Sequence, residues 1–307
     1  MKKTVPRKYF LDVFDLLVYL LILAVAAWSI FPIIKNPTTS YFYGGDDALI
    51  AWILNQTIQK IPDNLGNIFN ANIFFPFKNT LAYGVMLIPS AFLAYIPVKL
   101  TGSHFLAYNF SIVISQFLTV TVLFLWFKEL TKSRFASLIG TLTFALSQIR
   151  MLFVVHAHFF IMQWFLTSSF MIWRYTQNKK IWQLYVASLF LVIQIWDNIY
   201  LFYWTAFLGA ILLFPHLKNL KKGFKHLIRI SFFVVIFSLP VINAYLSVYR
   251  QFGFAGSIRE SAHFSMSFDD IWKSYISYGL YLNLLIVLLF TKKVKSGKLK
   301  DLKWILL

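Results

Sequence analysis

The sequence contains no cysteine, so it can form neither a disulfide framework nor a thiolate site. Charged residues are also scarce, at 13% of 307 residues against roughly 25% in a typical soluble domain, whereas 59% are apolar. A soluble protein of this composition could not cover its own surface, which excludes a cytosolic enzyme, a disordered chain and a disulfide-rich secreted module. The apolar residues form continuous rather than alternating runs, so we expect an all-α polytopic membrane protein.

Long apolar runs predict about eight transmembrane helices, because a helix needs about 20 residues to cross the hydrocarbon core. A ninth run, Leu81–Leu100, contains Pro89 and Pro97, which favours a re-entrant or interfacial helix that is broken near Pro89. The whole chain, 1–307, is therefore expected to form one transmembrane domain. The eight predicted spans are Phe10–Ile34, Phe105–Phe127, Phe135–Val155, Phe159–Trp173, Ile181–Trp196, Ile199–Phe214, Ile230–Val248 and Tyr275–Phe290.

Lysine and arginine set the predicted orientation, because the cytoplasmic loops of membrane proteins are enriched in basic residues. If every basic cluster is cytoplasmic, the spans alternate correctly only when Leu81–Leu100 stays on the outer side. The N-terminus is then cytoplasmic, and the net charge of +18 is explained without a nucleic-acid partner. The clusters are Lys2–Lys8, Lys128–Arg134, Arg174–Lys180, Lys218–Arg229 and Lys292–Lys303.

The first outer loop, residues 35–104, is too apolar to be a free loop. Ala48–Ile61 has helical apolar spacing, so we expect juxtamembrane helices that lie on the bilayer, with Trp52 and Tyr41–Tyr43 at the interface. At the other end of the chain, Trp304–Leu307 restarts an apolar run after a basic loop. This pattern predicts the first turn of a further span, in a protein longer than 307 residues.

Two adjacent acids give the strongest local signal for chemistry. Asp46 and Asp47 follow Gly44 and Gly45 on the predicted outer side, and a helix is expected to begin at Asp47. Adjacent carboxylates can hold a divalent cation such as Mg²⁺ or Mn²⁺, or one of them can act as a general base. The alternative is that one of them only caps the helix N-terminus. Their position in the predicted topology favours the functional interpretation.

Two further outer turns carry ionisable side chains. His156 and His158, close to Arg150, could bind a metal or donate to an anionic oxygen, or they could cap two helix ends. Asp197 lies in a tight turn between two short predicted spans, where a role at a helix terminus is the simpler interpretation.

A later outer loop combines glycines with charged side chains. It carries Arg259, Glu260 and His263 on the predicted outer face. The planar guanidinium group of arginine suits bidentate contacts with phosphate, so Arg259 is a candidate for binding a phosphorylated ligand. The alternative is a solvated loop in which Arg259 and Glu260 have no ligand.

The order of these features resembles the GT-C superfamily of integral membrane glycosyltransferases, in which a first span precedes an outer loop with paired acids and juxtamembrane helices. The segments that carry the resemblance are Asn72–Pro76 with Leu81–Gly102, Phe135–His158 and Phe252–Ser265. The resemblance implies a transferase in a bacterial plasma membrane that takes its sugar from a polyprenyl-phosphate donor. Members are longer and have more spans, so this chain resembles an N-terminal portion of one.

Transferred to this sequence, the family's catalytic acid corresponds to Asp46 or Asp47, as a base or as a ligand of a divalent metal. The donor phosphate would be contacted by Arg259 together with Arg150 or His158. Two other classes of function stay open. A transporter or lipid flippase would place ionisable groups near the bilayer midplane, and a non-catalytic assembly subunit would have dispersed outer acids.

Overall fold

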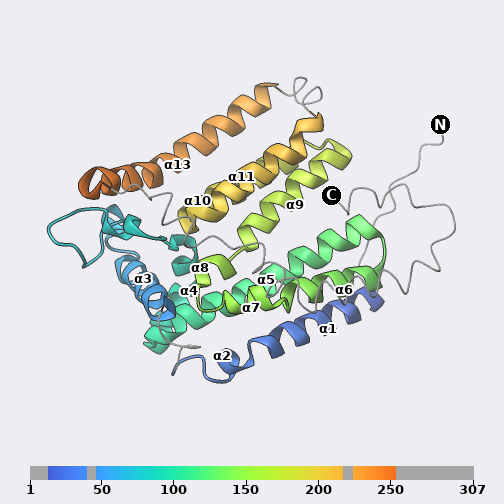
Figure 1. Cartoon of the computed structure of the whole chain (residues 1–307), viewed down its shortest axis with the longest axis horizontal. Coiled ribbons are helices and arrows are strands. Elements are labelled where there is room, and N and C mark those ends of the chain that lie inside the picture. Colours follow the sequence, from blue (N-terminus) through green and yellow to red (C-terminus); the bar gives the residue numbers. More distant parts are fainter. Residues whose placement is uncertain (1–12, 40–45, 217–223, 254–307) are drawn as a thin grey trace, which may run out of the picture. The chain divides into compact units, whose positions relative to one another are not determined.

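The computed structural model describes residues 13–39, 46–216 and 224–253, and every regular element among them is an α-helix or a 3₁₀ turn (Figure 1). The all-α class expected from the sequence is confirmed for these residues. The chain divides into two compact units, of which the first, 1–146 with 150–254, contains nearly all of the described residues. The predicted span Tyr275–Phe290 lies outside the described residues.

The helices are labelled in chain order in Figure 1. The α-helices are α1 Val13–Ser29, α2 Phe31–Lys35, α3 Asp46–Lys60, α4 Ile88–Thr101, α5 His104–Thr131, α6 Arg134–Ala145, α7 Gln148–Leu152, α8 Ala157–Phe160, α9 Gln163–Asn178, α10 Trp182–Asp197, α11 Ile199–Leu213 and α13 Phe224–Phe252. The 3₁₀ turns are η1 Leu65–Asn67, η2 Thr80–Tyr83 and η3 Phe214–His216.

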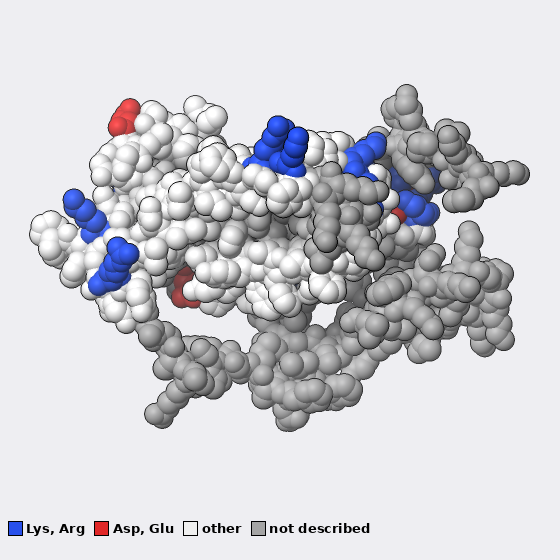
Figure 2. All heavy atoms as spheres, turned by 90° about the horizontal axis from the view of Figure 1, so that it is seen from above, with Lys and Arg blue, Asp and Glu red and all other residues white. Residues whose placement is uncertain are grey.

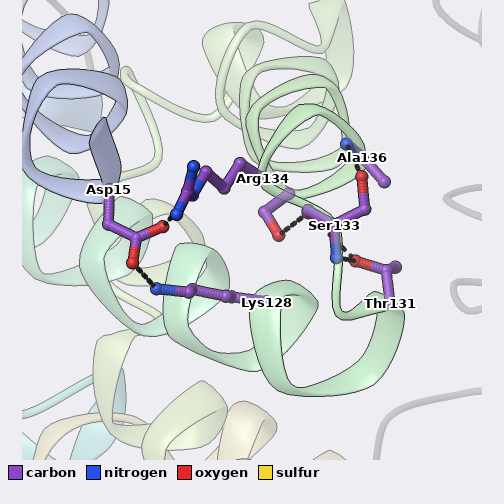
Figure 3. A network of polar contacts seen from close by, with 7 residues as sticks. Asp15, Lys128, Thr131, Ser133, Arg134 and Ala136 are labelled. Carbon is purple, nitrogen blue, oxygen red and sulfur yellow. Dashed lines mark hydrogen bonds and ion pairs between the residues drawn. The ribbon is translucent and has the colours of Figure 1, made fainter. Parts of the chain in front are cut away.

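Helix α5 is the central element, with α1, α3, α4, α6 and α9 packed against it. At the C-terminal end of α5, Lys128 pairs with the buried carboxylate of Asp15 in α1. The same carboxylate lies 2.8 Å from Nε of Arg134, at the start of α6 (Figure 3). At the N-terminal end of α5, Asn109 donates to the carbonyl of Pro37, just after α2, at 2.8 Å. Helices α1 and α5 therefore run antiparallel.

This arrangement constrains the segment between α2 and α5. The segment starts after α2, near the N-terminal end of α5, and it ends at His104, the first residue of α5. Both of its ends therefore lie at one end of the bundle, as expected for a segment that does not cross the membrane. Helix α4 spans 14 residues, roughly 21 Å at 1.5 Å per residue, which is shorter than a hydrocarbon core of roughly 30 Å. The helix begins at Ile88, with Pro89 in its first turn, and the apolar run Leu81–Leu100 is interrupted just before it, at the non-helical residues 84–87.

Helix α3 differs in part from its expectation. It begins at Asp46, one residue before the predicted start, and covers most of the predicted Ala48–Ile61 segment. Its side chains are largely buried against α4 and α5, and Trp52 is half-buried in the main core. The helix is therefore packed into the bundle, and its position at the membrane interface stays a prediction.

Three helices are long and apolar enough to cross a membrane: α5, the continuous 199–216 segment containing α11, and α13. They coincide with three predicted spans. Four other predicted spans correspond to helices of 12 to 17 residues, so the count of eight stays a prediction. On α11 and α13 most apolar side chains face outward, such as Trp204 at 62% and Phe232 at 67% exposure, and the face in Figure 2 carries few charges over its described part.

Candidate functional site

The first predicted site residue, Asp46, is paired with a histidine from a distant part of the sequence. Its Oδ2 atom lies 2.8 Å from Nδ1 of His156, and the two side chains are 58% and 43% exposed. Asp46 is the first residue of α3, and His156 directly precedes α8, which contacts α3. The acid predicted in the first outer loop and the histidine predicted in the second thus form one accessible pair.

The second acid, Asp47, points in a different direction. It is fully buried, accepts a hydrogen bond from the backbone N–H of Ala48 at 2.9 Å, and interacts electrostatically with Tyr108 of α5. Tyr108 in turn donates to the carbonyl of Val154. Successive residues of a helix point about 100° apart, so one acid faces solvent and its neighbour faces the core. The adjacent acids are therefore not a matched pair.

His158 lies beside the Asp46–His156 pair in a more buried environment. Its ring centroid is 6.1 Å from that of His156. Burial, helped by the nearby His156 and opposed by Asp46, lowers the pKa of His158 to about 4. The imidazole is therefore neutral near pH 7, and its Nδ1 atom is buried without a hydrogen-bond partner among the described residues.

A buried turn between α10 and α11 supports this region. Asn198 caps α11 by accepting from the N–H of Tyr200 at 2.8 Å, and its amide donates to the carbonyl of His158. The preceding residue, Asp197, accepts from the N–H and the hydroxyl of Ser90 at 3.2 and 2.8 Å. Ser90 is in the first turn of α4, so a carboxylate from a distant helix caps α4, and the Asp197 backbone carbonyl also accepts from Leu87.

The sequence-based interpretation of this turn was incomplete. A role at a helix terminus was expected for Asp197, but the helix that it caps is α4 and not one of the two helices that it joins. Asn198 was not selected at all, although an Asp-Asn pair between two apolar segments is a signal for capping. Together, the two residues link α10 and α11 to α4 and to the backbone of His158.

Arg150 is buried, although the predicted contact with a donor phosphate needs an accessible guanidinium group. It is 3% exposed, and its guanidinium donates to Oε1 of Gln116 at 3.0 Å and to the carbonyl of Phe160 at 3.0 Å. It also lies 4.0 Å from the ring centroid of Phe160. These contacts give Arg150 a role in joining α7 and α8 to α5. The remaining candidates, Arg259, Glu260 and His263, lie outside the described residues.

The described residues do not suit the divalent metal that the resemblance implies. Mg²⁺ prefers several oxygen ligands, but Asp46 faces imidazoles and Asp47 faces the core. No group of three or more His, Asp or Glu side chains among residues 13–39, 46–216 and 224–253 is arranged to hold a metal ion. We therefore derive no chemical step through a metal.

Comparison with known proteins gives no family assignment: no protein-family model, curated protein or solved structure matches this chain. The geometry itself supports acid–base chemistry. Asp46 holds Nδ1 of His156, which leaves Nε2 of His156 to accept or donate a proton. The neutral imidazole of His158 lies beside this pair. The pair lies near the N-terminal end of α5, whereas Asp15 and Lys128 lie at the other end.

Proposed function

We propose that this chain is a membrane glycosyltransferase of the GT-C type, which moves a sugar from a polyprenyl-phosphate donor to an acceptor on the outer face of a bacterial plasma membrane. The N-terminus would be cytoplasmic in this arrangement. The observation that carries the proposal is the exposed pair of Asp46 and His156. The long apolar helices support the membrane placement, since the outward side chains of α11 and α13 suit a lipid environment.

In the proposed reaction, His156 is the general base. With Nδ1 protonated and donating to Asp46, Nε2 accepts the proton of the acceptor hydroxyl. The acceptor oxygen then bonds to the anomeric carbon, while the bond from that carbon to the phosphate oxygen breaks and leaves its electron pair on the phosphate. Asp46 stabilises the imidazolium that forms, as the acid of a catalytic triad does.

The donor phosphate needs hydrogen-bond donors beside this pair. His158 is neutral near pH 7 because burial lowers its pKa to about 4, so one ring N–H can donate to a phosphate oxygen. Arg259 is proposed to supply the positive charge from the later outer loop. Preorganised donors at a leaving phosphate commonly contribute most to such a transfer.

A transporter or lipid flippase is the second candidate, and one feature favours it. Arg150 is buried against Gln116, about midway along α5, and ionisable groups at such a depth often line the substrate or ion path of a transporter. The accessible acid–histidine pair is nevertheless near an end of the bundle, which suits an enzyme better. A non-catalytic subunit is the third candidate and requires no conserved chemistry at Asp46.

Transfer activity separates these candidates. The chain, in a form that includes any residues following Leu307, is reconstituted in liposomes and supplied with radiolabelled polyprenyl-phosphate sugars. We expect Asp46→Asn and His156→Gln each to lower the transfer rate by about 10²–10⁴-fold, the usual contribution of a general base. Asp63→Asn is the matched control, because Asp63 is an exposed acid in the same predicted outer loop, residues 35–104. Normal transfer by both site variants would exclude the proposed role of the pair.

A further inference from the structure

The loop between α3 and α4 has a neck that is closed by hydrogen bonds. The backbone N–H of Asn79 donates to the side-chain oxygen of Asn70 at 2.7 Å. The hydroxyl of Thr80 accepts from the N–H of Ala71 at 3.0 Å and donates to its carbonyl at 3.1 Å. These bonds hold the two ends of the 70–80 loop together, so its tip has a defined position.

The tip of this loop is apolar and exposed. Phe74, Phe75, Pro76 and Phe77 are consecutive, and Phe75 is 95% exposed, whereas Phe74 and Phe77 are 43% and 46% exposed. A hydrogen bond from the N–H of Phe77 to the carbonyl of Phe74, 2.9 Å long, closes the turn. Phe74 has a φ of +57°, a conformation that a bulky side chain rarely adopts. Turns in water normally carry Gly, Asn or Asp, so four exposed apolar residues here require another environment.

Aromatic contacts fix the loop against the C-terminal end of α13. The ring centroid of Phe252 lies 5.5 Å from that of Phe74 and 4.7 Å from that of Phe77. Tyr83 completes the cluster, 4.8 Å from Phe74, and Gln251 donates to the carbonyl of Lys78. In Figure 1 the loop projects beside that end of α13. Phe75 is directed away from this cluster, since nearly all of its surface is exposed.

The tip continues an apolar surface that already suits lipid. Helix α13 is long and apolar enough to cross a membrane, and its outward apolar side chains extend from Phe232 to Tyr249, close to the loop. In the proposed membrane placement, a loop fixed at the end of α13 lies where the acyl chains meet the head groups. Aromatic side chains are enriched at this level, and Lys78, next to the tip, can extend to a lipid phosphate.

We propose that the 74–77 tip is a lipid-inserting wedge, with Phe75 held in the interface between head groups and acyl chains of the leaflet that faces the Asp46–His156 pair. The partner is the lipid surface itself. The proposal uses the membrane placement in the proposed function but not the sugar transfer.

The absence of native cysteine allows a direct test. Single cysteines are introduced as Phe75→Cys, Asp63→Cys and Phe232→Cys and labelled with an environment-sensitive fluorophore. The proteins are reconstituted in phosphatidylcholine–phosphatidylglycerol liposomes that contain nitroxide lipids, with the nitroxide either near the head group or deep in the acyl chain. Iodide in the buffer serves as the aqueous quencher. Asp63 is the control for a water-exposed position in the same loop, and Phe232 is the control for lipid contact along α13.

The label at position 75 is expected to lose most of its fluorescence to the shallow nitroxide lipid and little to iodide. The label at 63 should behave in the opposite way, and the label at 232 should respond to a nitroxide lipid. Strong iodide quenching at 75, equal to that at 63, would overturn the proposal by placing the tip in water. A label at 75 that neither quencher reaches would also overturn it, because protein would then cover the tip. None of these readings depends on transfer activity.

Discussion

Asp46 Oδ2 and His156 Nδ1 lie 2.8 Å apart, which joins the start of α3 to the residue that precedes α8. An exposed contact of this kind contributes little to stability, about 0–1 kcal/mol. The pair therefore adds little to the packing of α3 against α8. The neighbouring Asp47 has the opposite character, since it is buried beside Tyr108.

The two adjacent acids should respond differently to truncation. Asp47→Ala leaves the backbone N–H of Ala48 without its acceptor beside a buried position, which should lower the free energy of unfolding by about 1–3 kcal/mol. Asp46→Ala should change it by less than about 1 kcal/mol, since that pair is exposed. Thermal unfolding followed by tryptophan fluorescence in detergent measures both. Equal loss of stability in the two variants would contradict the assignment of Asp47 to the core.

His158 should make stability depend on pH in a defined direction. Its pKa is lowered to about 4 in the folded protein, from an ordinary value of 6.5, chiefly by burial. Between pH 4 and pH 6.5, His158 binds more protons in the unfolded chain than in the folded protein. Its contribution to the free energy of unfolding is therefore complete above pH 6.5 and is lost as the pH falls toward 4.

The His158→Phe variant isolates this effect. Its thermal midpoint should fall less than that of the original protein when the pH is lowered from 7 toward 4. The comparison is made as a difference between the two proteins, because other groups titrate in both. His226→Phe provides a matched histidine control elsewhere in the bundle, with its ring hydrogen-bonded to Tyr185. A His158→Phe profile parallel to the original would contradict a neutral, buried His158.

The carboxylate of Asp197 should stabilise α4. Asp197→Ala leaves the N–H and hydroxyl of Ser90 without their acceptor at a buried position, which should cost about 1–3 kcal/mol, the usual range for a buried polar group that loses its partner. Ser90→Ala should cost less, because the backbone N–H still donates. The double variant should be less destabilised than the sum of the single variants, with a coupling of about 0.5–3 kcal/mol. Additive effects in denaturant or thermal unfolding would argue against this cap.

The predicted topology can be tested by labelling single cysteines in intact cells. Thr101→Cys, at the end of α4, should react with a membrane-impermeant maleimide from outside, because the 35–104 segment is predicted to begin and end on the outer side. Lys180→Cys, in the turn between α9 and α10, should react only after permeabilisation. Both positions are exposed, so access is not limited by packing. Labelling of Thr101→Cys only from the cytoplasm would contradict a non-crossing Leu81–Leu100.

Composition and periodicity were sufficient to predict the helical class, the long apolar helices and the start of α3. These properties follow from local chemistry: continuous apolar runs such as those of α5 and α13 have no other favourable arrangement, and Gly44 and Gly45 before two acids favour a helix start. The candidate residues Asp46, His156 and His158 could also be selected from residue type and predicted side of the membrane. Their pairing could not, because the sequence alone does not specify how distant turns meet.

Only the tertiary structure decided which of these residues are accessible and which partners they have. A rotation of about 100° around α3 separates accessible Asp46 from buried Asp47, and helix packing determines which of them faces α8. The same packing places Arg150 against Gln116 and Phe160, and places Asp197 at the start of α4. Residue types and spacing determine which groups are present, whereas burial and partners, which depend on distant helices, determine what each group can do.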